Sequence, residues 1–465
     1  MKLFRTKSIQ DIIANSEKKT LKKTIGVFDL IMLGIGCTIG TGIFVVTGIA
    51  AAKYAGPGIS LSYLLAAFAC LFAALAYAEL ASMVPVAGSA YTYAYAVLGE
   101  FVAWLVGWGL VLEYTIGGAT VASGWSGYMV GILKTGGIIL PEALTKVPSE
   151  GGIINLPAVF ISLFIGLLLV RGTKESVVIN RILVGVKLTA IFIFLYVAAP
   201  NIKMENWVNF MPFGWSGVAL GAAMVFYAYI GFDAVATAAE ECKNPTKDVP
   251  YGIIGSLIVC TILYVTVALV LTGIVSYTEL NNAEPLAYAL RQNGSNIGSI
   301  LVATGAIAGM TTVLLVLIYA QSRIFFVIAR DGLIPSYFSK LHKKYDTPHI
   351  SLILVIVAVV VTSGFTPIAT LGHLTSLGTL FSFAVVAIGV MVLRLTKPDL
   401  KRPFKCPLVY IVAPMAVLTC GYLIYYLLLE TWKPFLIWSI LGLIVYFGYS
   451  YHNSPLNNHN SSSKL

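Results

Sequence analysis

Long apolar blocks without charged side chains are the feature that most restricts how this chain can fold. Gly252–Val275, for example, contains no charged residue over 24 positions. A block of that length matches the ~20 residues of a helix that crosses a bilayer, and inside lipid every backbone polar group must be satisfied within its own segment. Only 11% of the 465 residues are charged, against roughly 25% in soluble domains. We therefore predict an all-α membrane protein.

Twelve blocks of this kind predict twelve transmembrane helices. The connection 84–99 between the second and third blocks has no basic residue and carries Tyr91, Tyr93 and Tyr95, so we expect a helix that lies in the membrane interface there. The predicted spans are Val27–Ala51, Ile59–Met83, Phe101–Leu133, Ile153–Val170, Val177–Ala199, Val218–Ala239, Gly252–Val275, Ile297–Ile328, Ile350–Phe365, Ser376–Leu393, Leu408–Leu429 and Phe435–Tyr449.

Lysine and arginine are distributed unevenly over the connections. With the N-terminus inside, the cytoplasmic segments hold 22 of them and the outer connections hold six. This asymmetry predicts a multi-pass protein of the inner (plasma) membrane with both termini in the cytoplasm. It also accounts for the net charge of +10, so no nucleic-acid partner is inferred. The polar stretch 1–24 lacks the apolar core of a cleavable signal peptide.

Glycines interrupt the first span, and a similar interruption occurs in the sixth. Four glycines stand between Gly34 and Gly42, and each costs about 1 kcal/mol against alanine in a helix interior. Close helix packing through Gly-x-x-x-Gly spacing is one explanation, and an unwound centre at 40–42 is the other. The sixth span contains Gly231 followed by the ionisable Asp233. Interrupted segments at corresponding positions of two halves indicate a transporter site.

The ends that such breaks create suit a zwitterion. A new helix N-terminus near Gly42 would offer free N–H groups and a positive dipole end to a carboxylate. Carbonyls freed near Thr38 and near Tyr227 and Ala228 would accept hydrogen bonds from an ammonium. A molecule that carries both groups is an α-amino acid, so the residues predict an amino acid as cargo.

Several motifs resemble those of a known family, the amino acid–polyamine–organocation (APC) transporters, and most closely its bacterial relatives of the cationic amino acid transporters. These motifs are Ile-Gly-Thr-Gly-Ile-Phe at 39–44, Ala-Tyr-Ile-Gly-Phe-Asp at 228–233, Glu-Glu-x-Lys-Asn-Pro-x-Lys-Asp-x-Pro at 240–250 and Arg-Asp-Gly-Leu-Ile-Pro at 330–335.

The resemblance implies the leucine-transporter fold, a 5+5 inverted repeat with two further C-terminal helices. The chain would then divide into an N-terminal cytoplasmic segment (1–26), two five-helix repeats (27–199 and 218–393), helices 11 and 12 (394–452) and a disordered cytoplasmic tail (453–465).

The resemblance also implies which residues bind substrate. The first broken segment would meet the carboxylate and part of the ammonium, and the second would line the ammonium and side-chain region. Met310 is a weaker candidate, for which simple packing is favoured. The expected substrate-binding residues are Thr38, Ile39, Gly40, Thr41, Gly42, Tyr227, Ala228, Ile230 and Met310.

Two ionisable residues inside predicted spans are candidates for proton coupling. Lys187 resembles the lysine that replaces sodium in proton-coupled relatives, where it would face the carbonyls of Gly36 and Ile39. The alternative is that its side chain extends to the cytoplasmic surface. Glu113 could be a proton relay, a wall of the pocket or a structural partner of a hydroxyl. At the inner end of the sixth span, Glu240 and Glu241 stand beside Lys243 and Arg330. A cytoplasmic gate of ion pairs and an ordinary solvated loop are equally expected for this segment.

The sequence thus predicts a secondary active transporter, a permease that moves amino acids by proton-coupled symport with alternating access. An exchanger without net proton coupling is the alternative. We expect Asp233 to point away from the pocket, so small neutral amino acids are favoured over cationic ones. Neither an enzyme nor a channel is expected, since no metal-ligand spacing, ATP-binding motif or selectivity-filter repeat occurs. The expected partners are the amino acid, protons and the lipid bilayer, with free cysteine thiols, no metal and no cofactor.

Overall fold

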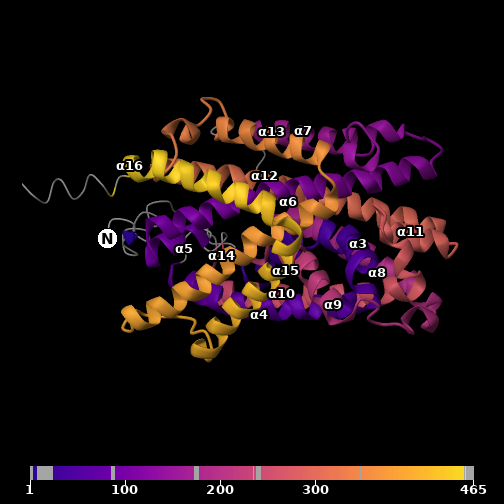
Figure 1. The fold of residues 1–465 in the computed structure, drawn as a ribbon, viewed down its shortest axis with the longest axis horizontal. Helices are drawn as coiled ribbons and strands as arrows, with labels where there is room; N and C mark the ends of the chain where they lie inside the picture. The colour runs from indigo at the N-terminus through magenta and orange to yellow at the C-terminus, as the bar shows by residue number, and fades with distance from the viewer. Residues whose placement is uncertain are drawn as a thin grey trace, which may run out of the picture.

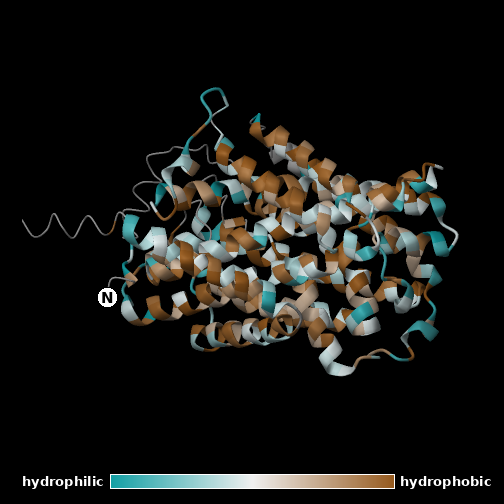
Figure 2. Ribbon diagram, turned by 45° about the horizontal axis from the view of Figure 1, so that its top comes forward, coloured by the Kyte–Doolittle hydropathy of each residue, from teal (hydrophilic) through white to brown (hydrophobic). Residues whose placement is uncertain are grey.

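The computed structural model describes residues 4–7, 25–84, 90–171, 177–233, 235–236, 242–345, 347–454 and 456. Within these ranges the protein is helical, and its only β-type pairing is one bridge between Ile25 and Cys242. Figure 1 shows long helices running side by side along the long axis of the molecule. Hydrophobic residues follow the length of these helices, whereas hydrophilic ones gather toward the two ends (Figure 2). This is the distribution that a bilayer imposes on a helical bundle.

Each predicted apolar block contains a helix or part of one. In chain order the main helices are α2 (Val27–Thr38), α3 (Thr47–Ala50), α4 (Ile59–Met83), α6 (Glu100–Thr135), α7 (Leu156–Val170), α8 (Val177–Ala198), α9 (Gly214–Val225), α10 (Pro245–Ile274), α11 (Pro285–Gln292), α12 (Asn296–Arg330), α13 (His349–Phe365), α14 (Ile368–Thr396), α15 (Val409–Val445) and α16 (Tyr451–Asn453).

Eight helical stretches of the described chain are long and apolar enough to cross a membrane, and three further apolar helices, α2, α7 and α13, are shorter. The all-helical membrane fold is therefore confirmed, while the count of twelve spans and the 5+5 repeat stay predictions. The blocks predicted as spans 11 and 12 are joined in α15, whose helix is interrupted at Thr431 (φ −131°).

The centre of the bundle is built by α6 and α12, which pack along each other, with α14 also packed along α6. Helix α10 packs along both α2 and α4. Small residues allow these close approaches, as at Gly378 of α14, where an added Cβ would lie 2.6 Å from the carbonyl oxygen of Gly109 in α6. Such contacts are typical of helix association in membranes, where packing replaces the hydrophobic driving force.

The segment predicted to lie in the membrane interface has a different environment. It forms α5 (Ala90–Val97), which packs against α6 and α14. Tyr91, Tyr93 and Tyr95 are at most 3% exposed, and the hydroxyl of Tyr91 donates to Asp331 at 2.9 Å. The helix itself is confirmed, with its tyrosines buried within the protein, and its level in the membrane interface stays a prediction.

Candidate functional site

The first broken helix ends where the glycine-rich motif begins. Helix α2 stops at Thr38, and Ile39 is extended (φ −75°, ψ 103°). The chain returns to helical geometry as a π-helical turn, Gly42–Val46, which leads into α3. The interruption at 39–41 thus overlaps the predicted unwound centre, 40–42, and lies one residue earlier.

The second break lies at the end of α9. A 3-10 turn, Phe226–Tyr229, follows this helix, and Ile230 is extended (ψ 131°). Gly231 has a φ of +117°, a conformation that residues with a Cβ rarely adopt. An added Cβ at Gly231 would also lie 2.9 Å from the carbonyl carbon of Cys37. Glycine is therefore needed here both for the backbone turn and for the approach to α2.

The two breaks meet in space. A Cβ added at Gly42 would lie 2.5 Å from the Cα of Ala228, so the two backbones are in direct contact. The hydroxyl of Tyr264, from α10, lies 3.0 Å from the carbonyl oxygen of Thr38 and 2.8 Å from that of Ala228. Both carbonyls were predicted to accept hydrogen bonds from the substrate ammonium. The hydroxyl has one hydrogen, which these two carbonyls share, and a carbonyl oxygen has two lone pairs, so each carbonyl keeps at least one free acceptor position beside Tyr264.

A small enclosed cavity lies between the broken ends. Its volume is about 20 Å³, room for about one water molecule and far below the several hundred Å³ of ligand pockets. It brings together the predicted residues Thr38, Gly40, Thr41, Gly42, Tyr227, Ile230 and Glu113, and it adds Cys37, Gly117, Val313, Leu317 and Thr375, which sequence reasoning missed.

Two polar side chains of this cavity lack protein partners. Among the described residues, Thr41 Oγ1 and both carboxylate oxygens of Glu113 are buried without a hydrogen bond. The neighbouring hydroxyl of Thr379 donates instead to the backbone oxygen of Thr375 at 3.4 Å. Buried polar groups in proteins almost always have a partner. Glu113 is therefore placed to accept a hydrogen bond or a proton from a molecule in the cavity. Thr41, whose hydroxyl lies near that of Tyr227, is placed to exchange a hydrogen bond with the same molecule.

Met310 and Ala228 do not line the cavity, and neither does Ile39. Met310 is fully buried in α12, and its sulfur would lie 3.2 Å from a Cβ added at Gly124. This position fits the packing role that the sequence analysis favoured. Ala228 contributes its backbone contacts to Gly42 and Tyr264 instead.

Lys187 lies outside the cavity, where α8 meets α2 and α12. Its side chain is 1% exposed, which rules out an extension to the cytoplasmic surface. The Nζ atom donates to the carbonyl oxygen of Gly36 at 2.6 Å, one of the two carbonyls predicted to face it. Gly309 makes room for its stem, since an added Cβ would lie 2.9 Å from the Cγ of Lys187.

Asp233 is buried and does not line the cavity, in line with the expectation that it points away. The predicted gate at Glu240 and Glu241 lies outside the described residues. No cluster of potential metal ligands occurs within the described part of the chain.

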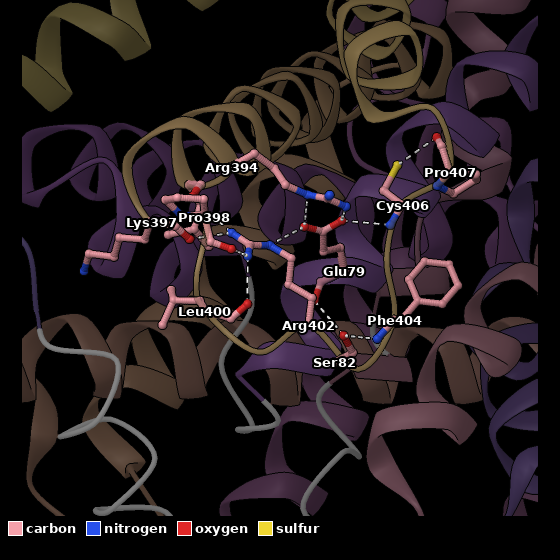
Figure 3. A network of polar contacts seen from close by, with 11 residues as sticks. Glu79, Ser82, Arg394, Lys397, Pro398, Leu400, Arg402, Phe404, Cys406 and Pro407 are labelled. Atoms are coloured by element: carbon pink, nitrogen blue, oxygen red, sulfur yellow. Dashed lines mark hydrogen bonds and ion pairs between the residues drawn. The ribbon is translucent and has the colours of Figure 1, made fainter.

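Glu79, in α4, is the buried carboxylate at the centre of the polar network drawn in Figure 3. Its carboxylate accepts from Arg394 Nε at 2.9 Å and Nη2 at 2.7 Å, and from the backbone N–H of Cys406 at 2.8 Å. The Nε of Arg402 lies 3.2 Å away. The network ties α4 to the connection between α14 and α15, far from the cavity, so a structural role fits it.

Comparison with known proteins agrees with this architecture. The family model described as "Amino acid permease" matches residues 25–448. The chain is 47% identical over 461 residues to the branched-chain amino acid permease BcaP of Bacillus subtilis (strain 168), covering 98% of this chain and 99% of that protein. It is 45% identical to the methylthioribose transporter of the same strain, with 98% and 99% covered. It is 41% identical to the chloroplastic cationic amino acid transporter 9 of Arabidopsis thaliana, with 83% and 69% covered.

All three relatives are named as permeases or transporters, and none as an enzyme. The bacterial relatives and the apolar helices indicate a multi-pass protein of the cell membrane. The resemblance drawn from the four motifs is thereby confirmed: the chain belongs to the amino acid permease family of the APC superfamily.

Proposed function

We propose that this permease carries small neutral amino acids into the cell by proton-coupled symport. The observation that carries the proposal is the meeting of the two broken helices around a cavity that also contains the unpartnered carboxylate of Glu113. The N–H groups that begin the turn at Gly42 suit a carboxylate. The second acceptor position on the carbonyl of Thr38, which lines the cavity, suits an ammonium.

The apolar side of the cavity supports a neutral side chain. Ile230, Val313 and Leu317 supply aliphatic surface, whereas Asp233 is not among the residues that line the cavity. With Glu113 protonated, the cavity has no negative charge to stabilise a cationic side chain. The cavity of about 20 Å³ has to enlarge to hold an amino acid, which fits a transporter that alternates between conformations.

Lys187 is the proposed coupling group. Its amine is held against the carbonyl of Gly36 in α2, two residues before the cavity residue Thr38. Loss of its proton would remove a charged donor from this broken helix. Glu113 is proposed as a second proton site, since it lies within the cavity itself.

Uptake into proteoliposomes tests the proposal. Labelled alanine, leucine, lysine and methylthioribose are compared in sodium-free buffer, with and without an inward proton gradient. We expect alanine or leucine to accumulate only with the gradient, and lysine to compete weakly. Uptake that requires a preloaded amino acid and ignores the gradient would identify an exchanger. Methylthioribose is included because a relative at 45% identity is named as its transporter. Preferred uptake of methylthioribose would overturn the proposal that the substrate is an amino acid.

Lys187→Ala separates coupling from binding. We expect this variant to lose accumulation driven by the gradient while it still exchanges amino acid across the membrane. Lys203→Ala, at an exposed lysine of the connection before α9, is the matched control and should accumulate substrate normally. Undiminished accumulation by Lys187→Ala would contradict the coupling role.

A further inference from the structure

The connection between α14 and α15 forms a basic pocket that amino acid transport does not use. Its volume is about 510 Å³. Four of its lining residues are lysine or arginine and only one is acidic. The lining residues are Arg394, Pro398, Asp399, Leu400, Lys401, Arg402, Lys405 and Tyr410.

Buried hydrogen bonds hold the walls of this pocket in place. The guanidinium of Arg402 donates to the carbonyl oxygens of Pro398 and Leu400, both at 2.7 Å. It also approaches Glu79, which is shared with Arg394 (Figure 3). One carboxylate cannot neutralise two guanidinium groups. The network therefore gives the pocket a fixed shape and leaves it with excess positive charge.

Further positive groups surround the same space. Lys401 and Lys405 are exposed, and neither makes an ion pair among the described residues. Helix α15 begins at Val409, so the first N–H groups of this helix, including that of the lining residue Tyr410, have no partner within the helix. A helix N-terminus beside basic side chains is suited to an anion with several oxygen atoms, such as a phosphate group.

Exposed apolar residues stand next to the lining residues in the sequence. Leu395, Leu408 and Ile411 are 69%, 73% and 60% exposed, and they flank the basic connection on both helices. Leu408 has a φ of +42° and is the only described residue other than glycine with a positive φ. A leucine rarely adopts this conformation, and here its large apolar side chain is left exposed in the connection that forms the pocket.

We propose that this pocket binds the phosphate headgroup of an anionic phospholipid, whose acyl chains lie along Leu395, Leu408 and Ile411. Free inorganic phosphate shares the headgroup chemistry, but the apolar border favours a lipid. The connection lies at the same end of the bundle as residues 4–7 (Figure 1), the end that the distribution of basic residues assigns to the cytoplasm. Basic pockets between helix ends on that side suit acidic headgroups.

Native mass spectrometry of the purified protein tests the site. Phosphatidylglycerol is titrated into detergent-solubilised protein, and phosphatidylcholine and inorganic phosphate are titrated in parallel. The double variant Lys401→Gln/Lys405→Gln leaves Arg394 and Arg402, which hold the fold, unchanged. We expect phosphatidylglycerol binding to weaken about 30-fold in this variant, the equivalent of about 1 kcal/mol for each lysine near the surface.

Two further variants keep the test decisive. Lys343→Gln/Lys344→Gln removes the same charge from another exposed connection and should bind phosphatidylglycerol like the wild type. Leu408→Gly removes apolar surface at a position whose positive φ glycine adopts without strain. This variant should therefore bind phosphatidylglycerol more weakly and bind inorganic phosphate as the wild type does. If both double lysine variants lost phosphatidylglycerol binding equally, the loss would be explained by net charge alone, and the proposal would be overturned. Binding of inorganic phosphate as tight as that of phosphatidylglycerol, unchanged by Leu408→Gly, would replace the lipid with a soluble anion.

Discussion

Replacing Gly42 by alanine tests whether the contact between the two broken helices shapes the substrate site. The added Cβ would lie 2.5 Å from the Cα of Ala228 and 3.3 Å from its backbone nitrogen. These are backbone atoms, so no side-chain rotation can relieve the contact, and the two segments have to move apart. Overpacking of this kind costs about 1–3 kcal/mol. If the strain falls on the substrate site, affinity should drop roughly 5- to 150-fold.

Equilibrium binding of labelled alanine measures this effect, with thermal unfolding of the detergent-solubilised protein followed in parallel. Gly185→Ala is the matched control, because no atom lies within 4 Å of its added Cβ. Gly40→Ala should show an intermediate loss, since its Cβ would meet the movable Val313 side chain at 3.2 Å. Wild-type affinity and stability in Gly42→Ala would refute the reasoning, because they would mean that the two backbones are not in contact in the binding conformation.

Three other variants or conditions have defined outcomes. Glu79→Gln leaves the buried Arg402 and the half-buried Arg394 without their carboxylate and should lower the free energy of unfolding by about 3–5 kcal/mol. Glu142→Gln, in an exposed ion pair, should leave the free energy of unfolding nearly unchanged; chemical denaturation compares the two. Gly309→Ala would press on the stem of Lys187 and should reduce uptake driven by a proton gradient at least tenfold while counterflow exchange persists. Burial, followed by the charge of Glu79, raises the pKa of the Cys406 thiol to about 12, so the unreactive neutral thiol persists up to nearly that pH. Maleimide should therefore leave Cys406 unlabelled at pH 8 in the folded protein and label it after unfolding; rapid labelling of the folded protein would contradict this.

The course of the helices could be predicted from the sequence because lipid imposes a strong and local rule. Helix α4 has the predicted bounds, Ile59–Met83, since its apolar block ends sharply at both sides. The break at 39–41 also followed from local composition, because glycines accumulate there. The burial of the three tyrosines of α5 did not, since tyrosines in a short helix are compatible both with contact to lipid and with a protein interior.

Apart from Glu113, the residues that line the cavity could be predicted only where they belong to the broken segments. Tyr264, Val313 and Thr375 come from α10, α12 and α14, and nothing in their local sequence distinguishes them from other residues of apolar helices. Their roles arise from how distant helices pack, which single-sequence patterns do not encode. Glu113 was found because a carboxyl group in a membrane helix is costly and stands out.

The positions of Tyr264 and Lys187 on α2 suggest how substrate and proton could affect each other. Tyr264 holds the carbonyl of Thr38, at the end of α2, together with that of Ala228. Lys187 holds the carbonyl of Gly36, two residues earlier and therefore about 3 Å along the helix axis. An amino acid that enlarges the cavity has to separate Thr38 from Ala228, and this movement shifts the carbonyl that Lys187 holds. Under the proposed coupling, the substrate cavity and Lys187 affect each other directly through the C-terminal end of α2.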